Sequence, residues 1–368
     1  MISQVENFTP DWVSAPGDTI LDLMEERDWN QVELANRLGF STKHLNQLIK
    51  GKVTLTYDTA QKLERVLGST VSFWMNRESK YRQHVARLEA EQNYKSWTDW
   101  LDDVPVNELK KIGAIENLRS IESNKPKLVE HLLSFFGVAS PDEWRSYYGS
   151  MSASFRKTKE EQANNGAISA WLRLGEIEAE KTSAPKYNRL KFENAIKKIR
   201  ELTVQSPADF YPTLFGLCLE AGVKLLLVKS ITKSHVSGVA RWLNGHSPII
   251  QLSLYGKTND KFWFTFFHEA AHILLHSDVK SDIFLDNTEF KSLNQQEQEA
   301  NAWAGNILIP EKHKFDLVGL RSRGEILEFS KRVNVHPGII IGRLQHEGII
   351  SHKSNLNKLK DSFENVRD

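Results

Sequence analysis

Cysteine is almost absent from this sequence, and Cys218 is the only one among its 368 residues. A single thiol excludes an internal disulfide and a zinc site built from several cysteines, and it is typical of a reducing compartment. An excess of one charge sign is also missing, since 48 lysines and arginines face 47 aspartates and glutamates. No global basic field therefore indicates nucleic acid, and any DNA contact must come from a local patch.

Long apolar runs are missing as well. No run approaches the ~18 residues that a membrane span needs. The first residues show no basic segment followed by an apolar one, as a secretory signal would. We therefore expect a cytoplasmic protein with no membrane partner. The composition, 40% hydrophobic and 26% charged, is typical of a globular protein, and the length suits two or three domains.

The character of the chain changes twice, which predicts three domains: residues 1–80, 81–205 and 206–368. Short helical patterns broken by glycines fill the first stretch, and longer helical patterns rich in charge fill the second. The expected fold class is α+β, mostly α. It combines an all-α bundle at the N-terminus, a helical connector and a C-terminal domain of sheet and helices.

The sheet is expected early in the third stretch. Three short β-rich runs occupy 223–228, 236–243 and 249–253, and turn residues that include Asn244-Gly245 separate them. They predict a small, mainly antiparallel sheet, with helical segments after it.

A helix-turn-helix is expected near the N-terminus. The pattern predicts three helices, at 18–27, 30–38 and 41–49. Asn30 and Ser41 can cap the second and third helices, and Gly39 can adopt the positive φ of the tight turn between them. Ala35, Leu45 and Leu48 are the apolar positions that would hold these two helices together.

The opposite face of this motif is polar and locally basic. On the third helix, the side chains placed to meet base edges in the major groove are Thr42, Lys43, His44 and Gln47. Those placed to hold phosphates are Gln31, Lys50 and Lys52. A helical bundle used for protein contact has a polar face too, so the pattern alone leaves both interpretations open.

A family resemblance favours DNA. Residues 16–80 contain Asn30-Gln31-Val-Glu-Leu-Ala35, Leu48-Ile-Lys-Gly-Lys52 and Leu67-Gly68-Ser-Thr-Val-Ser-Phe-Trp74. They resemble the XRE-type domain of HigA-family antitoxins. The resemblance implies a homodimer that binds a palindromic, double-stranded operator and represses its own promoter, with a toxin as a further partner.

A metal-binding pattern lies in the third stretch. His268-Glu269-Ala-Ala-His272 is an H-E-x-x-H motif inside an apolar segment. Two histidines four residues apart lie on one face of a helix, so both imidazoles can reach one ion at ~2.0–2.1 Å. Glu269 stands where it can accept a proton from an activated water. The alternative, two hydrogen-bonded core histidines, would bury costly polar groups without a purpose.

The third ligand is harder to assign, although a catalytic zinc usually has three protein ligands and a water. His276 follows four residues later, but a straight helix drifts with each turn and would carry it away from the ion. In the next helical segment we expect Asn294 as N-cap and Glu297 as its capping-box partner. Glu299 is then left to point inward as third ligand, unless it is an exposed surface glutamate.

A second family resemblance covers this region. The motif with His276, followed by Glu299-Ala-Asn-Ala-Trp303-Ala and Leu308-Ile309-Pro310, is similar to the ImmA/IrrE metallopeptidases. Position by position, the resemblance implies His268, His272 and Glu299 as ligands and Glu269 as general base, in a zincin-like domain. Trp303 stands where an aromatic residue is usual, and Ile309 where methionine is common.

Three functions follow from the two resemblances. The first is a zinc-dependent endopeptidase that cleaves a repressor or antitoxin-like protein, itself or a partner, to relieve repression. The second is a HigA-like antitoxin or autorepressor whose metal domain binds or senses a partner without cleaving it. The third is an adaptor that holds a toxin. The intact Glu269 favours the first, because a structural metal site needs no base.

Several details stay open at this point. Two histidines and one glutamate accept Mn²⁺ or Fe²⁺ as well as Zn²⁺. The strand expected at 236–243 could hold a substrate backbone by strand addition. An oxyanion stabiliser is also expected, and the polar candidates are His235, Arg241, His246, Tyr255 and Arg343.

Overall fold

The computed structural model describes residues 14–158, 164–253, 258–276 and 290–362, and the side chains of 150–158 and 290–294 are outside this description. The chain divides into two compact units, Met1–Thr98 and Asp99–Asp368. The second unit thus contains both the sheet and the helices that precede it. The three-domain division made from the sequence stays a prediction.

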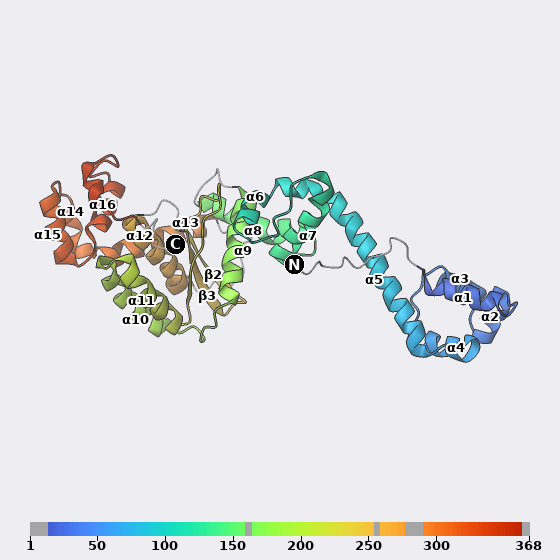
Figure 1. Cartoon of the computed structure of the whole chain (residues 1–368). Coiled ribbons are helices and arrows are strands. Elements are labelled where there is room, and N and C mark those ends of the chain that lie inside the picture. The colour runs from blue at the N-terminus through green and yellow to red at the C-terminus, as the bar shows by residue number, and fades with distance from the viewer. Residues whose placement is uncertain (1–13, 159–163, 254–257, 277–289, 363–368) are drawn as a thin grey trace, which may run out of the picture. The chain divides into compact units, whose positions relative to one another are not determined.

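In the described part of the first unit the chain is helical, as the blue to light-blue ribbon of Figure 1 shows. Its helices are α1 (Pro16–Glu25), α2 (Gln31–Leu38), α3 (Thr42–Ile49), α4 (Tyr57–Leu67) and α5 (Val71–Ser96). The Asn30 side chain accepts from the backbone N–H of Glu33, and that of Ser41 from His44. Gly39 has a φ of +68°, so both caps and the turn predicted from the sequence are confirmed.

The first unit has its own apolar core. Ala35, Leu45 and Leu48 are at most 3% exposed, and Trp74 from α5 is fully buried with them. Burial of each leucine side chain contributes about 1.5–3 kcal/mol relative to exposure. The two helices of the motif are therefore fixed against each other, as their apolar spacing predicted.

The second unit is built from a small sheet and many helices. Its helices before the sheet are α6 (Val106–Lys111), α7 (Lys125–Phe136), α8 (Pro141–Thr158), α9 (Asn165–Glu180), α10 (Arg189–Glu201) and α11 (Pro207–Glu220). The strands are β1 (Lys224–Leu227), β2 (Gly238–Leu243) and β3 (Ser247–Leu252). The later helices are α12 (Asn259–Leu275), α13 (Phe290–Leu308), α14 (Lys314–Leu317), α15 (Arg323–Val333) and α16 (Pro337–His346). The fold class is α+β, mostly α.

The sheet is mixed, in the order β1-β3-β2. β2 and β3 form an antiparallel hairpin, and Asn244 and Gly245 take the positive φ of its turn, +52° and +66°. β1 pairs with β3 in parallel because the chain first crosses to the far edge to form β2. Local turn signals predict the hairpin but not this crossover, so the mainly antiparallel sheet becomes a mixed one.

Helices cover the two faces of the sheet. On one face, Gln251 of β3 donates to the backbone carbonyl of Trp171 in α9 at 2.6 Å. On the other, Ile250 and Leu252 belong to the same buried core as Phe266 of α12. Figure 1 shows α9 beside β2 and β3, with α12 and α13 on their other side. The helix that carries the H-E-x-x-H motif thus lies directly on the sheet.

The C-terminal helix α16 packs against α12. Ile339, Ile340, Ile341 and Leu344 of α16 are at most 3% exposed. These side chains therefore belong to the apolar core of the second unit. None of the described helices combines the length and apolar character that crossing a membrane requires.

Candidate metal centre

The motif helix presents two imidazoles to one point. His268 and His272 are one turn apart on α12, and their Nε2 atoms lie 3.1 Å from each other. His268 is 5% exposed and Glu269 is 1% exposed. These three residues form a cluster whose possible ligand atoms all lie within 4.8 Å of one another. His272 is the more accessible member, with a side chain that is 20% exposed.

A carboxylate from α13 completes the arrangement. The two carboxylate oxygens of Glu297 lie 3.2 Å from Nε2 of His268 and 3.2 Å from Nε2 of His272. Ligand atoms bound tetrahedrally at ~2.0–2.1 Å are about 3.3 Å apart. The two nitrogens are 3.1 Å apart, and each lies 3.2 Å from one oxygen of the carboxylate, so all these separations are close to that value and the donor set suits zinc.

The structure does not bring Glu299 to this pair of histidines. Its side chain is 47% exposed, and its Oε2 lies 3.1 Å from Nε2 of His276 instead. The sequence pattern predicted that Glu297 would form a capping box with Asn294. The helix starts at Phe290, however, so Asn294 lies inside it and is not the N-cap. Glu297 is thereby available to the histidines, and the geometry favours it over Glu299 as third ligand.

Each histidine is oriented through its other ring nitrogen. Nδ1 of His268 lies 2.9 Å from the Oδ1 of Asn301, and Nδ1 of His272 lies 3.1 Å from Nδ1 of His276. A hydrogen bond at Nδ1 fixes the tautomer and leaves Nε2 to bind a metal. Asn301 follows Glu297 by four residues on the same face of α13, and this spacing is the signal that could have revealed both from the sequence.

His276 and Glu299 are electrostatically matched. Burial lowers the pKa of His276, which favours its neutral form. Hydrogen bonds from Gln295 and His276 lower the pKa of Glu299, which favours the carboxylate. A neutral imidazole therefore lies against an ionised carboxylate at the outer end of α12.

Glu269 is held close to the edge strand of the sheet. A Cβ built on Gly238 of β2 would lie 3.1 Å from Cγ of Glu269 and 2.6 Å from Cγ2 of Thr265. Only a glycine lets β2 approach α12 this closely. Among the described strands β2 pairs with β3 alone, so its other edge carries no ladder partner there.

Two of the oxyanion candidates, Arg241 and Arg343, form ion pairs with carboxylates outside the cluster. Arg241 lies on the α9 side of the sheet, where it pairs with Glu176 at 2.8 Å and donates to the carbonyl of Leu172. Arg343 pairs with Glu347 at 2.7 Å. Tyr255 lies outside the described residues. For His235 and His246 the assignment stays a prediction.

The expected DNA-contacting residues lie on one motif of the first unit. Thr42, Lys43, Lys50 and Lys52 are exposed, and His44 and Gln47 are half-buried beside them. Gln31 accepts from the side chain of Asn46 at 3.2 Å, which links the start of α2 to the middle of α3. The structure thus places these side chains on α2, α3 and the turn after α3, and their contacts with DNA stay a prediction.

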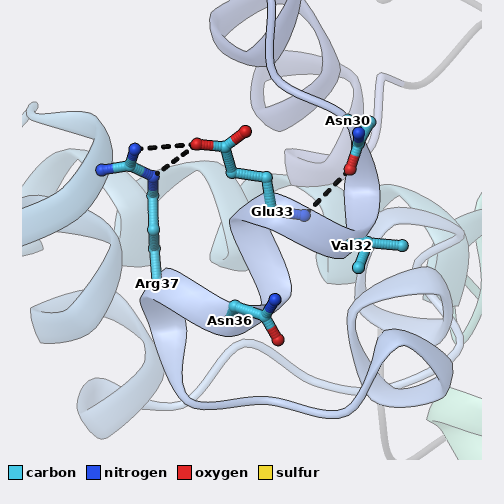
Figure 2. Close-up of a pocket in the computed structure, with 5 residues that line it drawn as sticks. All are labelled: Asn30, Val32, Glu33, Asn36 and Arg37. Carbon is cyan, nitrogen blue, oxygen red and sulfur yellow. Dashed lines mark hydrogen bonds and ion pairs between the residues drawn. The ribbon is translucent and has the colours of Figure 1, made fainter.

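A shallow depression lies on α2 itself, shown in Figure 2. Its polar groups bind one another: Arg37 pairs with Glu33 at 2.8 Å, and Asn30 caps the helix. The Arg37 guanidinium also lies 4.2 Å from the ring centre of Trp29. These contacts stabilise the second helix of the motif, and we assign the depression no chemistry of its own.

Two segments of the chain match models of known protein families. Residues 20–74 match the family model described as helix-turn-helix, and residues 220–345 match that of the IrrE N-terminal-like domain, a peptidase family. The first match covers α2 and α3, and the second covers β1 to α16, with His268, His272 and Glu297 inside it. Comparison with curated proteins and with solved structures found no match. The chain therefore joins a helix-turn-helix domain of the DNA-binding type to an IrrE-like domain of the metallopeptidase type.

Proposed function

We propose that this protein is a DNA-binding regulator with a zinc-dependent endopeptidase centre that cleaves a repressor or antitoxin-like protein, itself or a partner. The observation that carries the proposal is the convergence of Nε2 of His268, Nε2 of His272 and the Glu297 carboxylate, at separations of 3.1 to 3.2 Å. Glu269 beside them supplies a base, which a structural metal site does not need. Cleavage would then relieve repression.

The residues of the centre divide the chemistry among them. His268, His272 and Glu297 would hold the zinc, which would supply Lewis acidity to the scissile carbonyl and to water. Glu269 takes the proton of the attacking water and passes it to the leaving amine. Its burial at 1% exposure strengthens its electrostatic contacts and keeps competing water away. The same three ligands also accept Mn²⁺ or Fe²⁺.

The edge of β2 supplies a place for the substrate. An extended peptide can add to an unpaired strand edge through backbone hydrogen bonds. Gly238 brings that edge against Glu269, so an added strand would pass the base. We infer that the substrate segment is cleaved in an extended conformation, as an exposed loop or linker of a repressor would allow.

The first unit supplies the DNA contacts. Lys43 is exposed at the start of α3, where a recognition helix enters the major groove. We propose that the unit binds a double-stranded operator as a homodimer. A HigA-like antitoxin or autorepressor that binds a toxin without cleaving is the alternative, and its helix-turn-helix would look the same.

Intact mass spectrometry tests the peptidase. The zinc-loaded protein is incubated with its own promoter DNA and with the proteins encoded beside its gene. Glu269→Gln should abolish fragments while zinc stays bound, because the ligands are unchanged. Glu328→Gln, which removes an exposed carboxylate from α15, serves as matched control and should cleave as the wild type does. If neither wild type nor control produces fragments, the non-cleaving alternative takes the place of this proposal.

A gel-shift measurement tests the DNA contact in the same samples. Lys43→Ala should weaken binding to the promoter DNA, because it removes a proposed contact with a base edge in the major groove. Lys80→Ala on α5, which is also exposed, should leave the affinity unchanged. Equal affinity of both variants would exclude α3 as the DNA-binding helix.

A further inference from the structure

Two residues next to the metal centre have no part in the mechanism above. His276 follows His272 by one helical turn on α12, and its side chain is only 9% exposed. Its Nδ1 lies 3.1 Å from Nδ1 of His272, and its Nε2 lies 3.1 Å from Oε2 of Glu299. Glu299 in turn accepts from the side-chain amide of Gln295 at 2.9 Å.

The positions of the protons in this row of hydrogen bonds, from His272 through His276 to Glu299, follow from one condition. If Nε2 of His272 binds a metal, its Nδ1 carries the proton and must donate it. His276 must then accept at Nδ1, so its own proton sits on Nε2 and is donated to Glu299. The ionised carboxylate can only accept hydrogen bonds, so the row ends at Glu299. Every hydrogen bond in the row is then satisfied in one arrangement.

We propose that Glu299 and His276 form a hydrogen-bonded relay that holds His272 in the orientation and tautomer needed to bind the metal. The inference rests on the proposed metal centre. Both are positioning residues, because neither touches the reacting atoms. The relay also places a negative charge at the far end of the row, which makes the His272 imidazole a stronger donor to the metal.

The other histidine provides an internal contrast. Nδ1 of His268 donates directly to the side-chain amide oxygen of Asn301, which carries no net charge. His272 instead reaches a charged group through a second imidazole. Removing the charge of Glu299 should therefore weaken the hold on His272 without disturbing His268.

Zinc affinity measured by competition with a chromophoric chelator tests the relay without any need for activity. Glu299→Gln should bind zinc about 10–100-fold more weakly than the wild type, the range found when partners of metal-bound histidines are removed. Glu328→Gln removes a comparable exposed charge and should leave the affinity unchanged. Glu297→Gln removes a proposed ligand and should cost much more. Since Glu299 is half exposed, its variant tests the relay without a change in the core.

A double-mutant cycle distinguishes a relay from a simple charge effect. His276→Leu breaks the row, so Glu299→Gln should then cause no further loss of affinity. The visible spectrum of the cobalt-loaded protein reports the coordination number of the metal. This spectrum should be unchanged in Glu299→Gln and altered in Glu297→Gln, which lacks a proposed ligand.

Four results would overturn the relay. They are wild-type affinity in Glu299→Gln, an equal loss with and without His276, a loss as large in Glu328→Gln, and a cobalt spectrum in which Glu299→Gln matches Glu297→Gln. Each of these leaves the metal centre in place. Failure of the wild type to bind zinc at all would overturn the proposed function together with the relay.

Discussion

Glu297, Glu299 and Asn301 lie on one helix, yet they meet different partners. On an α-helix, residues four apart share a face, whereas residues two apart point to roughly opposite sides. Glu297 and Asn301 accordingly reach the H-E-x-x-H histidines, and Glu299 reaches only His276. A difference of two positions thus separates the proposed metal ligand from the residue proposed to position one.

Gly238 sets the distance between the strand edge and the base. A methyl group there would meet Thr265, Leu252 and Glu269 at 2.6, 2.9 and 3.1 Å. Gly238→Ala should therefore push β2 from α12 and lower the free energy of unfolding by about 1–3 kcal/mol. Chemical denaturation measures this change.

Gly216 provides the matched comparison, since a Cβ there would meet nothing within 4 Å. It lies inside α11, so Gly216→Ala should leave stability equal or raise it by up to about 1 kcal/mol. Equal stability of Gly238→Ala and the wild type would mean that β2 and α12 can separate at no cost.

His336 couples stability to pH. Its Nδ1 accepts from the N–H of Gly338 at the start of α16, and its Nε2 lies 3.0 Å from Asp361. Burial lowers its pKa from the ordinary value of 6.5, an effect that Asp361 partly opposes. The unfolded chain therefore takes up a proton first, so stability should fall as the pH drops below about 6.5.

His336→Asn keeps an acceptor at this N-cap but cannot titrate. The melting temperature of this variant should decline less than that of the wild type between pH 7 and pH 5. Parallel declines of the two proteins would assign the pH dependence to other groups.

At the scale of elements, Arg200 joins three helices. From α10 its guanidinium donates to the carbonyls of Ile307 and Leu308 at the end of α13 and of Val333 at the end of α15. Helix C-termini carry unpaired carbonyls and partial negative charge, which a cation satisfies. The contact fixes the end of α13, the helix that carries Glu297.

Loss of this contact should be costly. Arg200→Met leaves the carbonyls unpaired, so we expect the free energy of unfolding to fall by about 2–4 kcal/mol. On the same helix, Arg189 forms an exposed pair with Glu193, and Arg189→Met should cost less than about 0.5 kcal/mol. Denaturation curves of similar midpoint for the two variants would contradict the role given to Arg200.

At the scale of the whole molecule, the chain forms two units with separate apolar cores. A metal that binds only the second unit stabilises only that unit. In calorimetry we expect two unfolding transitions, and zinc should shift only one of them to higher temperature. At a zinc concentration one hundred times the dissociation constant, the free energy of unfolding of that unit should rise by about 2.7 kcal/mol. Glu297→Gln should remove this shift.

Leu45→Ala identifies the other transition. Leu45 is fully buried in the first unit, and its truncation should destabilise that unit by about 2–5 kcal/mol. A single transition that responds to both zinc and Leu45→Ala would show that the two units unfold together.

The sequence by itself determined whatever depends on neighbours along the chain. The caps at Asn30 and Ser41, the turn at Gly39, the Asn244-Gly245 hairpin and the pairing of His268 with His272 follow from spacings of a few residues. Such features are set by local hydrogen bonds and by the period of the helix. The helix-turn-helix, the H-E-x-x-H helix and the α+β class could therefore be predicted.

Only the tertiary structure decided what depends on where elements meet. The choice of Glu297 over Glu299 depends on how α13 packs against α12 and on where that helix begins. Arg241 pairs with Glu176 because α9 covers that face of the sheet, and β3 lies in the centre of the sheet because the chain crosses from β1 to the far edge before the β2–β3 hairpin forms. Contacts across many residues arise from packing and burial, which no local pattern in one sequence encodes.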